Sequence, residues 1–290
     1  MDNFKNHNYM NAYQLIVFLN LNLIEENKPR RIMAAKNLWT REELILAFNL
    51  YLKIPFGKMH STNKDIIHLA NLIGRTPSSI ALRLVNFASV DPALQARGIK
   101  GMVGGTKTVQ PIWDEFFTNQ EELIFLSEQI LAEKENSTIE SKYQDLLFDL
   151  KDLKGESIIR EVKTRVNQSV FRKMVLANYT SKCAITGIDI PELLLASHIV
   201  PWSKNEEHRL NPENGICLSA LYDKAFDKGI IGINKNHTII LSSSLKRKKD
   251  TDFFKNHFAP IENLKITGAV KYLPRMEFLD YHLDTIFDKY

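Results

Sequence analysis

The sequence predicts an α+β protein, with a helical first part followed by a second part that combines strands with helices. Two observations carry this prediction. Between residues 40 and 88, three segments with helical apolar spacing each begin at a residue suited to capping a helix. Between residues 193 and 229, the pattern is an apolar run, a polar loop, a second apolar run and a helical segment. A length of 290 residues is compatible with two domains of about 150 residues each.

The starts of the first three helices are marked by local chemistry. Thr40 and Glu43 have the spacing of a capping box, in which each side chain satisfies a backbone amide of the other. Asn63 is a suitable N-cap, and Thr76 is followed by Pro77 at the first helical position. The predicted helices cover residues 40–52, 63–73 and 76–88.

This helical region resembles the Myb/SANT-like helix-turn-helix pattern over about 50 residues. The resemblance rests on Trp39, the acidic start of the first helix and the segment 74–80 before the third helix. It implies that the third helix enters the major groove of DNA. However, Arg75 and Arg83 are the only Lys or Arg residues between positions 64 and 97. A helical platform that binds a partner or packs on the rest of the chain is therefore an equal alternative.

The chain is expected to divide into four segments. An acidic helical stretch over 111–135 closes the helical domain, and helically spaced apolar residues beyond it indicate a helical linker or, alternatively, a dimer contact. The asparagine-rich start is expected to be a disordered extension or a short docked helix. The segments are a 1–32 extension, a 33–135 recognition or partner domain, a 136–156 linker and a 157–290 second domain.

Three residues in the second domain could carry out hydrolysis. His198 ends an apolar run, and an imidazole with an ordinary pKa near 6.5 can accept a proton from water at neutral pH. Asp223 and Asp227 are four residues apart, so a helix places both carboxylates on one face. Paired carboxylate oxygens favour Mg²⁺ or Mn²⁺ over zinc.

Residues 171–241 resemble the HNH endonuclease family, through Ser-His-Ile-Val-Pro-Trp at 197–202, Asn214-Gly215 and Phe-Asp-Lys-Gly at 226–229. The resemblance implies a ββα-metal fold in which two antiparallel strands and a helix surround one divalent ion. It implies that His198 activates water. Asn214 would hold the loop, and with it the histidine ring, through side-chain hydrogen bonds to the backbone, and Asp223 and Asp227 would bind the metal. The ion would stabilise the charge on the phosphate and on the leaving 3′-oxygen, and the products would carry 5′-phosphates.

Two positions depart from the family pattern. Ser197 occupies a position where the family often has Asp or His as a metal ligand, and Asp223 replaces the last histidine. Simpler explanations also exist for single residues. A histidine that ends a strand is usually a packed core residue, Asn-Gly is a common turn, and Asp223 and Asp227 could lie on a solvated helix face.

Cysteine content and hydropathy indicate which metal sites and which cellular compartment are compatible with the sequence. Cys183 and Cys217 are the only cysteines, so a four-cysteine zinc site is excluded and both are expected in the core. The apolar run at 15–19 is much shorter than a membrane span, and no basic segment precedes it. These features predict a protein of the reducing cytoplasm with no membrane segment.

Positive charge is concentrated in the second part of the chain. Residues 157–290 carry 20 Lys and Arg against 15 Asp and Glu, whereas residues 1–156 carry 18 against 19. Cations near the motif are predicted to contact phosphates, which would position a duplex without reading its sequence. An exposed basic turn without a ligand is the alternative for 246–249. The predicted contacts are Arg209, Lys224, Lys228, Lys246, Arg247, Lys248 and Lys249.

The sequence thus predicts an endonuclease that uses Mg²⁺ or Mn²⁺ to cleave double-stranded DNA, with restriction or defence against foreign DNA as its setting. Two alternatives remain open: a non-catalytic DNA-binding regulator on the same scaffold, and an RNase or nuclease effector activated by a partner or a small signal. Cutting both strands needs two active sites or two successive nicks, which leaves a homodimer open as well.

Overall fold

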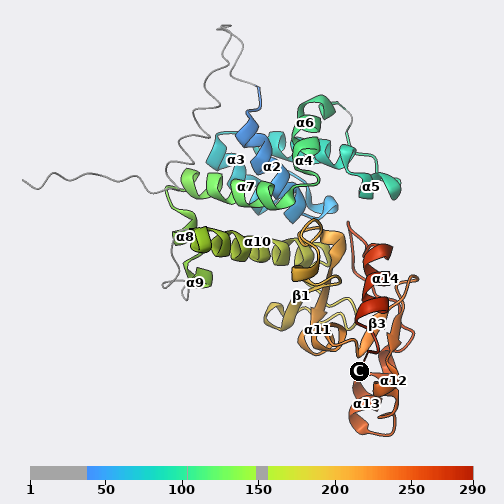
Figure 1. The fold of residues 1–290 in the computed structure, drawn as a ribbon. Coiled ribbons are helices and arrows are strands. Elements are labelled where there is room, and N and C mark those ends of the chain that lie inside the picture. Colours follow the sequence, from blue (N-terminus) through green and yellow to red (C-terminus); the bar gives the residue numbers. More distant parts are fainter. Residues whose placement is uncertain (1–37, 103, 148–155, 290) are drawn as a thin grey trace, which may run out of the picture.

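The computed structural model describes residues 38–102, 104–147 and 156–289 and shows an α+β fold. Its first part is helical, and its second part contains two short antiparallel sheets with helices around them (Figure 1). The 1–32 extension lies outside the described residues. The helices of the first part are α2 (Arg41–Lys53), α3 (Lys64–Ile73), α4 (Pro77–Val90), α5 (Pro92–Ala96), α6 (Thr106–Phe116), α7 (Gln120–Lys134), α8 (Ile139–Lys142) and α9 (Gln144–Leu147).

The three helices predicted from their capping residues are confirmed. Both halves of the Thr40/Glu43 capping box form at the start of α2. The Asn63 side chain accepts hydrogen bonds from two backbone amides of α3, and the Thr76 hydroxyl accepts one from the backbone of α4. Each cap satisfies amides that the first turn leaves without a helical partner, so the local sequence fixes where each helix begins.

The arginines of the expected DNA-reading segment face their own domain. The Arg75 and Arg83 guanidiniums lie 4.7 and 4.8 Å from the centroid of the Trp39 ring. Arg75 also pairs with Glu43, and Arg83 donates a hydrogen bond to Asn86. Helix α4 packs against α2, α3 and α6, and its apolar residues belong to the core. These contacts favour the platform hypothesis over groove reading.

The helical stretch expected over 111–135 is interrupted. Helix α6 begins upstream at Thr106, contains Pro111 and ends at Phe116, and α7 starts at Gln120. Val109, Ile112, Trp113 and Phe116 are buried on one side of α6. The short connection lets α7 turn back and pack along α2, which a single continuous helix could not do.

A long helix, α10 (Glu156–Asn178), joins the two parts of the chain. It contacts α2 and α7 in the first part and β1 and β2 in the second. Figure 1 shows it between the two groups of elements. The expected linker over 136–156 contains α8 and α9, and its residues 148–155 lie outside the described residues. The predicted boundary at 157 therefore falls at the start of a helix that packs on both parts.

The second part begins with a strand, strand, helix unit. Strands β1 (Leu194–His198) and β2 (Gly215–Ser219) pair antiparallel, with His198 opposite Gly215, and α11 (Ala220–Asp227) follows directly. Cys183 and Cys217 are free and buried, as expected. No helix of the described residues is long and apolar enough to cross a membrane. The remaining elements are β3 (Ile231–Ile233), β4 (Ile239–Leu241), α12 (Ser243–Lys246), α13 (Asp252–His257) and α14 (Met276–Thr285).

Buried polar contacts connect the two parts. The hydroxyls of Tyr51 and Tyr272 both donate to Asp91, the Tyr272 bond measuring 2.9 Å. The Lys271 ammonium is buried and donates to the Tyr51 carbonyl at 2.9 Å. Burial lowers the pKa of Lys271 to about 7, although the nearby charge of Asp91 acts in the opposite direction. The bonds made by Tyr272 and Lys271 cross between the two parts and would be lost if the parts separated, so they favour one fixed arrangement.

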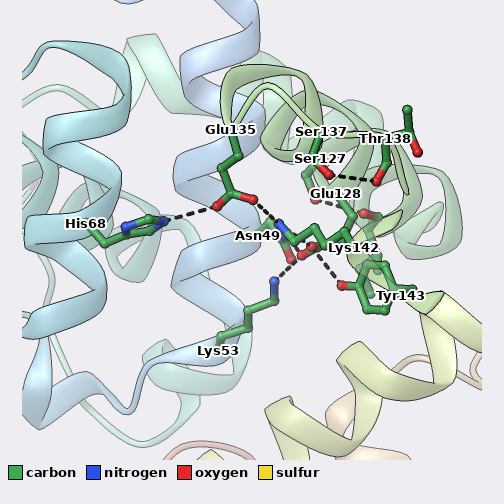
Figure 2. Close-up of polar contacts among 11 residues, drawn as sticks. Asn49, Lys53, His68, Ser127, Glu128, Glu135, Ser137, Thr138, Lys142 and Tyr143 are labelled. Carbon is green, nitrogen blue, oxygen red and sulfur yellow. Dashed lines mark hydrogen bonds and ion pairs between the residues drawn. The ribbon is translucent and has the colours of Figure 1, made fainter. Parts of the chain in front are cut away.

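A second buried polar cluster lies within the helical part and is centred on Glu128 (Figure 2). The Glu128 carboxylate pairs with Lys53 and Lys142 and accepts hydrogen bonds from Asn49 at 3.0 Å and Tyr143 at 2.8 Å. Burial alone would raise the pKa of this carboxyl, but the two lysines and the hydrogen bonds outweigh it and lower the pKa to about 2. The cluster ties α7 to α2 and to the segment after α7.

Replacing Glu128 by glutamine is expected to lower the free energy of unfolding at pH 7 by about 3 kcal/mol. The folded pKa of about 2 lies below the ordinary value of 4.5, so the stabilisation is complete above pH 4.5 and disappears as the pH falls toward 2. Urea unfolding at several pH values measures it. Glu42→Gln, at an exposed pair with Lys134, is the matched control and is expected to change stability by less than about 0.5 kcal/mol. An equal loss for Glu128→Gln at pH 2 and pH 7 would contradict this explanation.

Candidate active site

A cavity of about 510 Å³ lies beside the first sheet and gathers several of the predicted residues. Its walls come from β1, the segment after β1, α11 and α14. His198, Asp223, Asp227, Lys224 and Lys228 all line it. Residues 25 to 30 positions apart in the sequence thus meet in one cavity, because β2 returns antiparallel to β1 and leads directly into α11.

His198 is held from three sides. Its ring stacks on Phe171 of α10 with centroids 4.0 Å apart, and the Trp202 ring meets it edge-on at 5.5 Å. Its Nε2 lies 2.9 Å from the Arg209 carbonyl oxygen. A carbonyl oxygen only accepts, so Nε2 carries the proton and the lone pair is on Nδ1. Burial lowers the pKa of His198, with the bond to Arg209 acting against it, so the ring is neutral at pH 7 and able to accept a proton.

Asn214 closes the loop between the two strands. Its side chain is buried, with Oδ1 accepting from the Val200 amide at 2.8 Å. Its Nδ2 donates to the carbonyls of Val200 at 3.2 Å and His208 at 3.3 Å. These bonds fix both ends of the loop that carries Arg209, so Asn214 acts on the histidine through the loop.

The stacking of Phe171 on His198 depends on a glycine at position 215. Gly215 lies opposite His198 in the strand register. A Cβ atom at this position would lie 2.4 Å from Val175 Cγ2 and 2.8 Å from Phe171 Cζ. Both distances are far below van der Waals contact, so a side chain here would displace helix α10 or the Phe171 ring.

Gly215→Ala is expected to destabilise the protein by about 1–3 kcal/mol, because the added methyl overpacks the core between β2 and α10. It is also expected to slow cleavage by moving Phe171 away from the His198 ring. Thermal unfolding and a cleavage assay measure the two effects. Gly57→Ala is the control, since its Cβ would meet nothing within 4 Å and its backbone is not left-handed. A Gly215→Ala protein as stable and as active as the control would show that the close packing at β2 is unimportant.

The two aspartates of α11 are one helical turn apart and line the same cavity. Asp223 is half-buried and Asp227 is exposed at the rim. Burial raises the pKa of both, and for Asp227 the negative charge of Asp223 raises it further. Lys224 lowers both values, and the Ser197 hydroxyl lowers that of Asp223. The carboxylates are thus placed where a cation would relieve their mutual repulsion.

The side chains of the cavity fit a hard cation that keeps some of its water ligands better than a metal ion bound by protein ligands alone. Within residues 38–102, 104–147 and 156–289, no group of three or more His, Cys, Asp or Glu side chains is close enough to hold a metal ion. Asp223 and Asp227 offer two carboxylates, and the buried Ser197 hydroxyl next to them makes no hydrogen bond of regular geometry. Mg²⁺ is commonly bound by one or two carboxylates together with water and substrate phosphates. These residues fit such an ion and do not fit a structural zinc site.

The predicted phosphate contacts lie in four different surroundings. Lys224 and Lys228 line the cavity, while Arg247, Lys248 and Lys249 are exposed just after α12. Lys246 pairs with Glu262 at 2.7 Å. Arg209 differs from the others, because its guanidinium pairs with Glu121 of α7 and lies 5.0 Å from the centroid of the Trp202 ring.

Two residues of the candidate site were not found from the sequence. Phe171 stacks on His198, and this contact depends on how α10 crosses the sheet. His282 of α14 also lines the cavity; its ring lies parallel to Phe226 at 3.7 Å and its Nε2 is 2.9 Å from the Phe226 carbonyl oxygen. Burial lowers the pKa of His282 to about 4. No local pattern marks a histidine 84 positions away from His198 as its neighbour.

The comparisons with known proteins address this same region. A family model described as HNH endonuclease matches residues 183–234. The match includes β1, β2 and α11, and with them His198, Asn214, Asp223 and Asp227. A search of curated proteins finds no match. The strand, strand, helix unit and the family match agree, and residues 183–234 belong to the HNH endonuclease family.

Proposed function

We propose that this chain is a DNA endonuclease that depends on a divalent metal ion and hydrolyses phosphodiester bonds. The observation that carries the proposal is one cavity lined by a neutral His198 and by the two carboxylates of α11. A base and a cation site on the same cavity are the two elements that metal-assisted hydrolysis of a phosphodiester needs. The HNH family match over the same residues supports this assignment.

In this mechanism, Nδ1 of His198 takes a proton from the water molecule that attacks the phosphorus. Asp223 and Asp227 would hold Mg²⁺ or Mn²⁺, with the buried Ser197 oxygen beside them. When bound, the ion supplies positive charge to the phosphate and to the leaving oxygen. Lys224 and Lys228, at the edge of the cavity, hold neighbouring phosphates. Asn214 keeps the loop in place. The bond between phosphorus and the 3′-oxygen breaks, the leaving oxygen takes a proton from a solvent water molecule, and the products carry a 5′-phosphate and a 3′-hydroxyl.

Double-stranded DNA is the proposed substrate, and restriction or defence against foreign DNA is the proposed setting. The excess of 20 Lys and Arg over 15 Asp and Glu in residues 157–290 supports a polyanionic substrate. The exposed cations of 247–249 provide additional phosphate contacts outside the cavity. The described residues form one such site, so a double-strand break takes two chains or two successive nicks.

The purified chain should be incubated with supercoiled plasmid, linear duplex, single-stranded DNA and RNA, in Mg²⁺, Mn²⁺ or EDTA, with methylated and unmethylated DNA side by side. We expect metal-dependent nicking or linearisation of DNA, with 5′-phosphates at the mapped ends. Salt-sensitive duplex binding without cleavage in any metal would instead support a DNA-binding regulator. Cleavage of RNA alone, or only after a partner or small signal is added, would support the effector alternative.

A further inference from the structure

One ion pair links the helical part to the histidine of the active site. Glu121 is the second residue of α7, and its carboxylate accepts a hydrogen bond from Nε of Arg209. The two side chains are largely buried, with 19% of Arg209 and 27% of Glu121 exposed. Arg209 lies in the loop between β1 and β2, 88 positions after Glu121 in the sequence. The ion pair therefore connects the helical part to the loop between β1 and β2.

Arg209 is also the residue that orients His198. Its backbone carbonyl accepts the hydrogen bond from His198 Nε2 at 2.9 Å. Its guanidinium lies over the Trp202 ring, which in turn meets the His198 ring edge-on. The side chain that Glu121 holds and the carbonyl that fixes the histidine tautomer thus belong to one residue. The ion pair therefore anchors the residue whose carbonyl orients the histidine.

Helix α10 supports both ends of this connection. The Asn167 Nδ2 donates to the Glu121 backbone carbonyl at 3.4 Å, and the Asn167 side chain is fully buried. One turn later on the same helix, Phe171 stacks on the His198 ring. Because a helix turn is rigid over this length, the positions of Glu121 and His198 are coupled through a second set of contacts.

We propose that Glu121 is a positioning residue for catalysis, which holds Arg209 so that its carbonyl keeps His198 protonated at Nε2 and available at Nδ1. This inference rests on the proposed function of the site. It links the helical part of the chain to the geometry of the active site. Glu121 acts through Arg209 and has no role in contacting the substrate.

A double-mutant cycle tests the connection. Glu121→Gln and Arg209→Met each remove the ion pair and are expected to slow DNA cleavage about tenfold, because the base loses its alignment. The double variant is expected to be no slower than either single variant, since both act through one contact. Arg209→Lys keeps a positive charge and is expected to retain most of the rate. Glu122→Gln is the matched control: it is the next residue of α7, pairs with Lys163 and is expected to stay within about twofold of wild type.

Measuring the DNA affinity of the same variants distinguishes a positioning role of Arg209 from a direct contact between Arg209 and phosphate. If Arg209 binds phosphate, Glu121→Gln frees its guanidinium and tightens DNA binding, and only Arg209→Met weakens it. Tighter binding by Glu121→Gln with an undiminished cleavage rate would overturn the positioning role.

Nitrogen NMR of the His198 imidazole provides a readout that needs neither substrate nor metal. Wild type is expected to show separate shifts for a protonated Nε2 and an unprotonated Nδ1, and Glu121→Gln to show shifts that move toward each other as the tautomers mix. Unchanged shifts in Glu121→Gln would overturn the proposal. If wild type cleaves no nucleic acid, the proposed function fails, while the shifts still decide whether Glu121 positions the histidine.

Discussion

His198→Ala is expected to lower the rate of metal-dependent DNA cleavage by about two to four orders of magnitude, which is the usual contribution of a general base. The neutral ring has its lone pair on Nδ1 and lines the same cavity as the two carboxylates of α11, and the variant has no imidazole there to accept a proton. Initial rates of plasmid nicking under single-turnover conditions, at saturating Mg²⁺, measure the chemical step directly.

Two further variants make this result interpretable. Alanine also removes the ring that stacks on Phe171, so His198→Gln should be measured beside it, with thermal unfolding of both proteins. His60→Ala replaces an exposed histidine of the helical part and is expected to cleave at the wild-type rate. If a folded His198→Ala protein nicks plasmid as fast as wild type, another group is the base.

Asp223→Asn is expected to change activity and stability in opposite directions. Removing one carboxylate weakens binding of the divalent ion, and cleavage is expected to fall by about two to three orders of magnitude because several kcal/mol of charge stabilisation are lost. In the absence of metal, the same change removes the repulsion that raises the pKa of Asp227. The metal-free variant is therefore expected to be more stable than wild type by about 0.2–0.5 kcal/mol. Titration calorimetry with Mn²⁺ and urea unfolding in EDTA measure the two effects.

The exposed Asp250 supplies the control for this prediction. Asp250→Asn removes the same charge after α12 and is expected to change neither Mn²⁺ affinity nor cleavage by more than about twofold. Asp227→Asn should lie between the two, because Asp227 is exposed at the rim of the cavity. Mn²⁺ binding of wild-type strength in Asp223→Asn would mean that the ion is held elsewhere.

The parts of the fold that depend on neighbouring residues were predictable from the sequence. Caps such as Asn63 and Thr76 satisfy amides two or three residues away, so the starts of α3 and α4 follow from short segments. The strand, strand, helix unit follows in the same way from consecutive runs. The break between α6 and α7 was missed, because it is set by how α7 packs against α2, a contact between distant segments.

In the candidate site, too, the features set by nearby residues were predictable, and those set by contacts between distant segments were not. His198, Asp223 and Asp227 could be selected as candidates because their chemistry and spacing are visible within 30 residues, and the structure brings them to one cavity. The partners that tune them come from far along the chain: Phe171 from α10, His282 from α14 and Glu121 from α7. The assignment of Arg209 illustrates the limit. Its charge beside the motif indicated phosphate binding, whereas its guanidinium pairs with a carboxylate that only the folded chain brings to it.

Helix α10 has a consequence for how this protein could be divided or recombined. Its Val162 and Val166 pack with residues of the helical part, whereas Phe171 and Val175 are in the core beneath the first sheet. A nuclease domain cut out at residue 157 would expose Val162 and Val166 to solvent on its first helix. The helical part released by the same cut would lose the contacts that α10 makes with α2 and α7. The two halves are therefore better regarded as one cooperative folding unit than as exchangeable modules, and a single melting transition would be the thermodynamic mark of that shared helix.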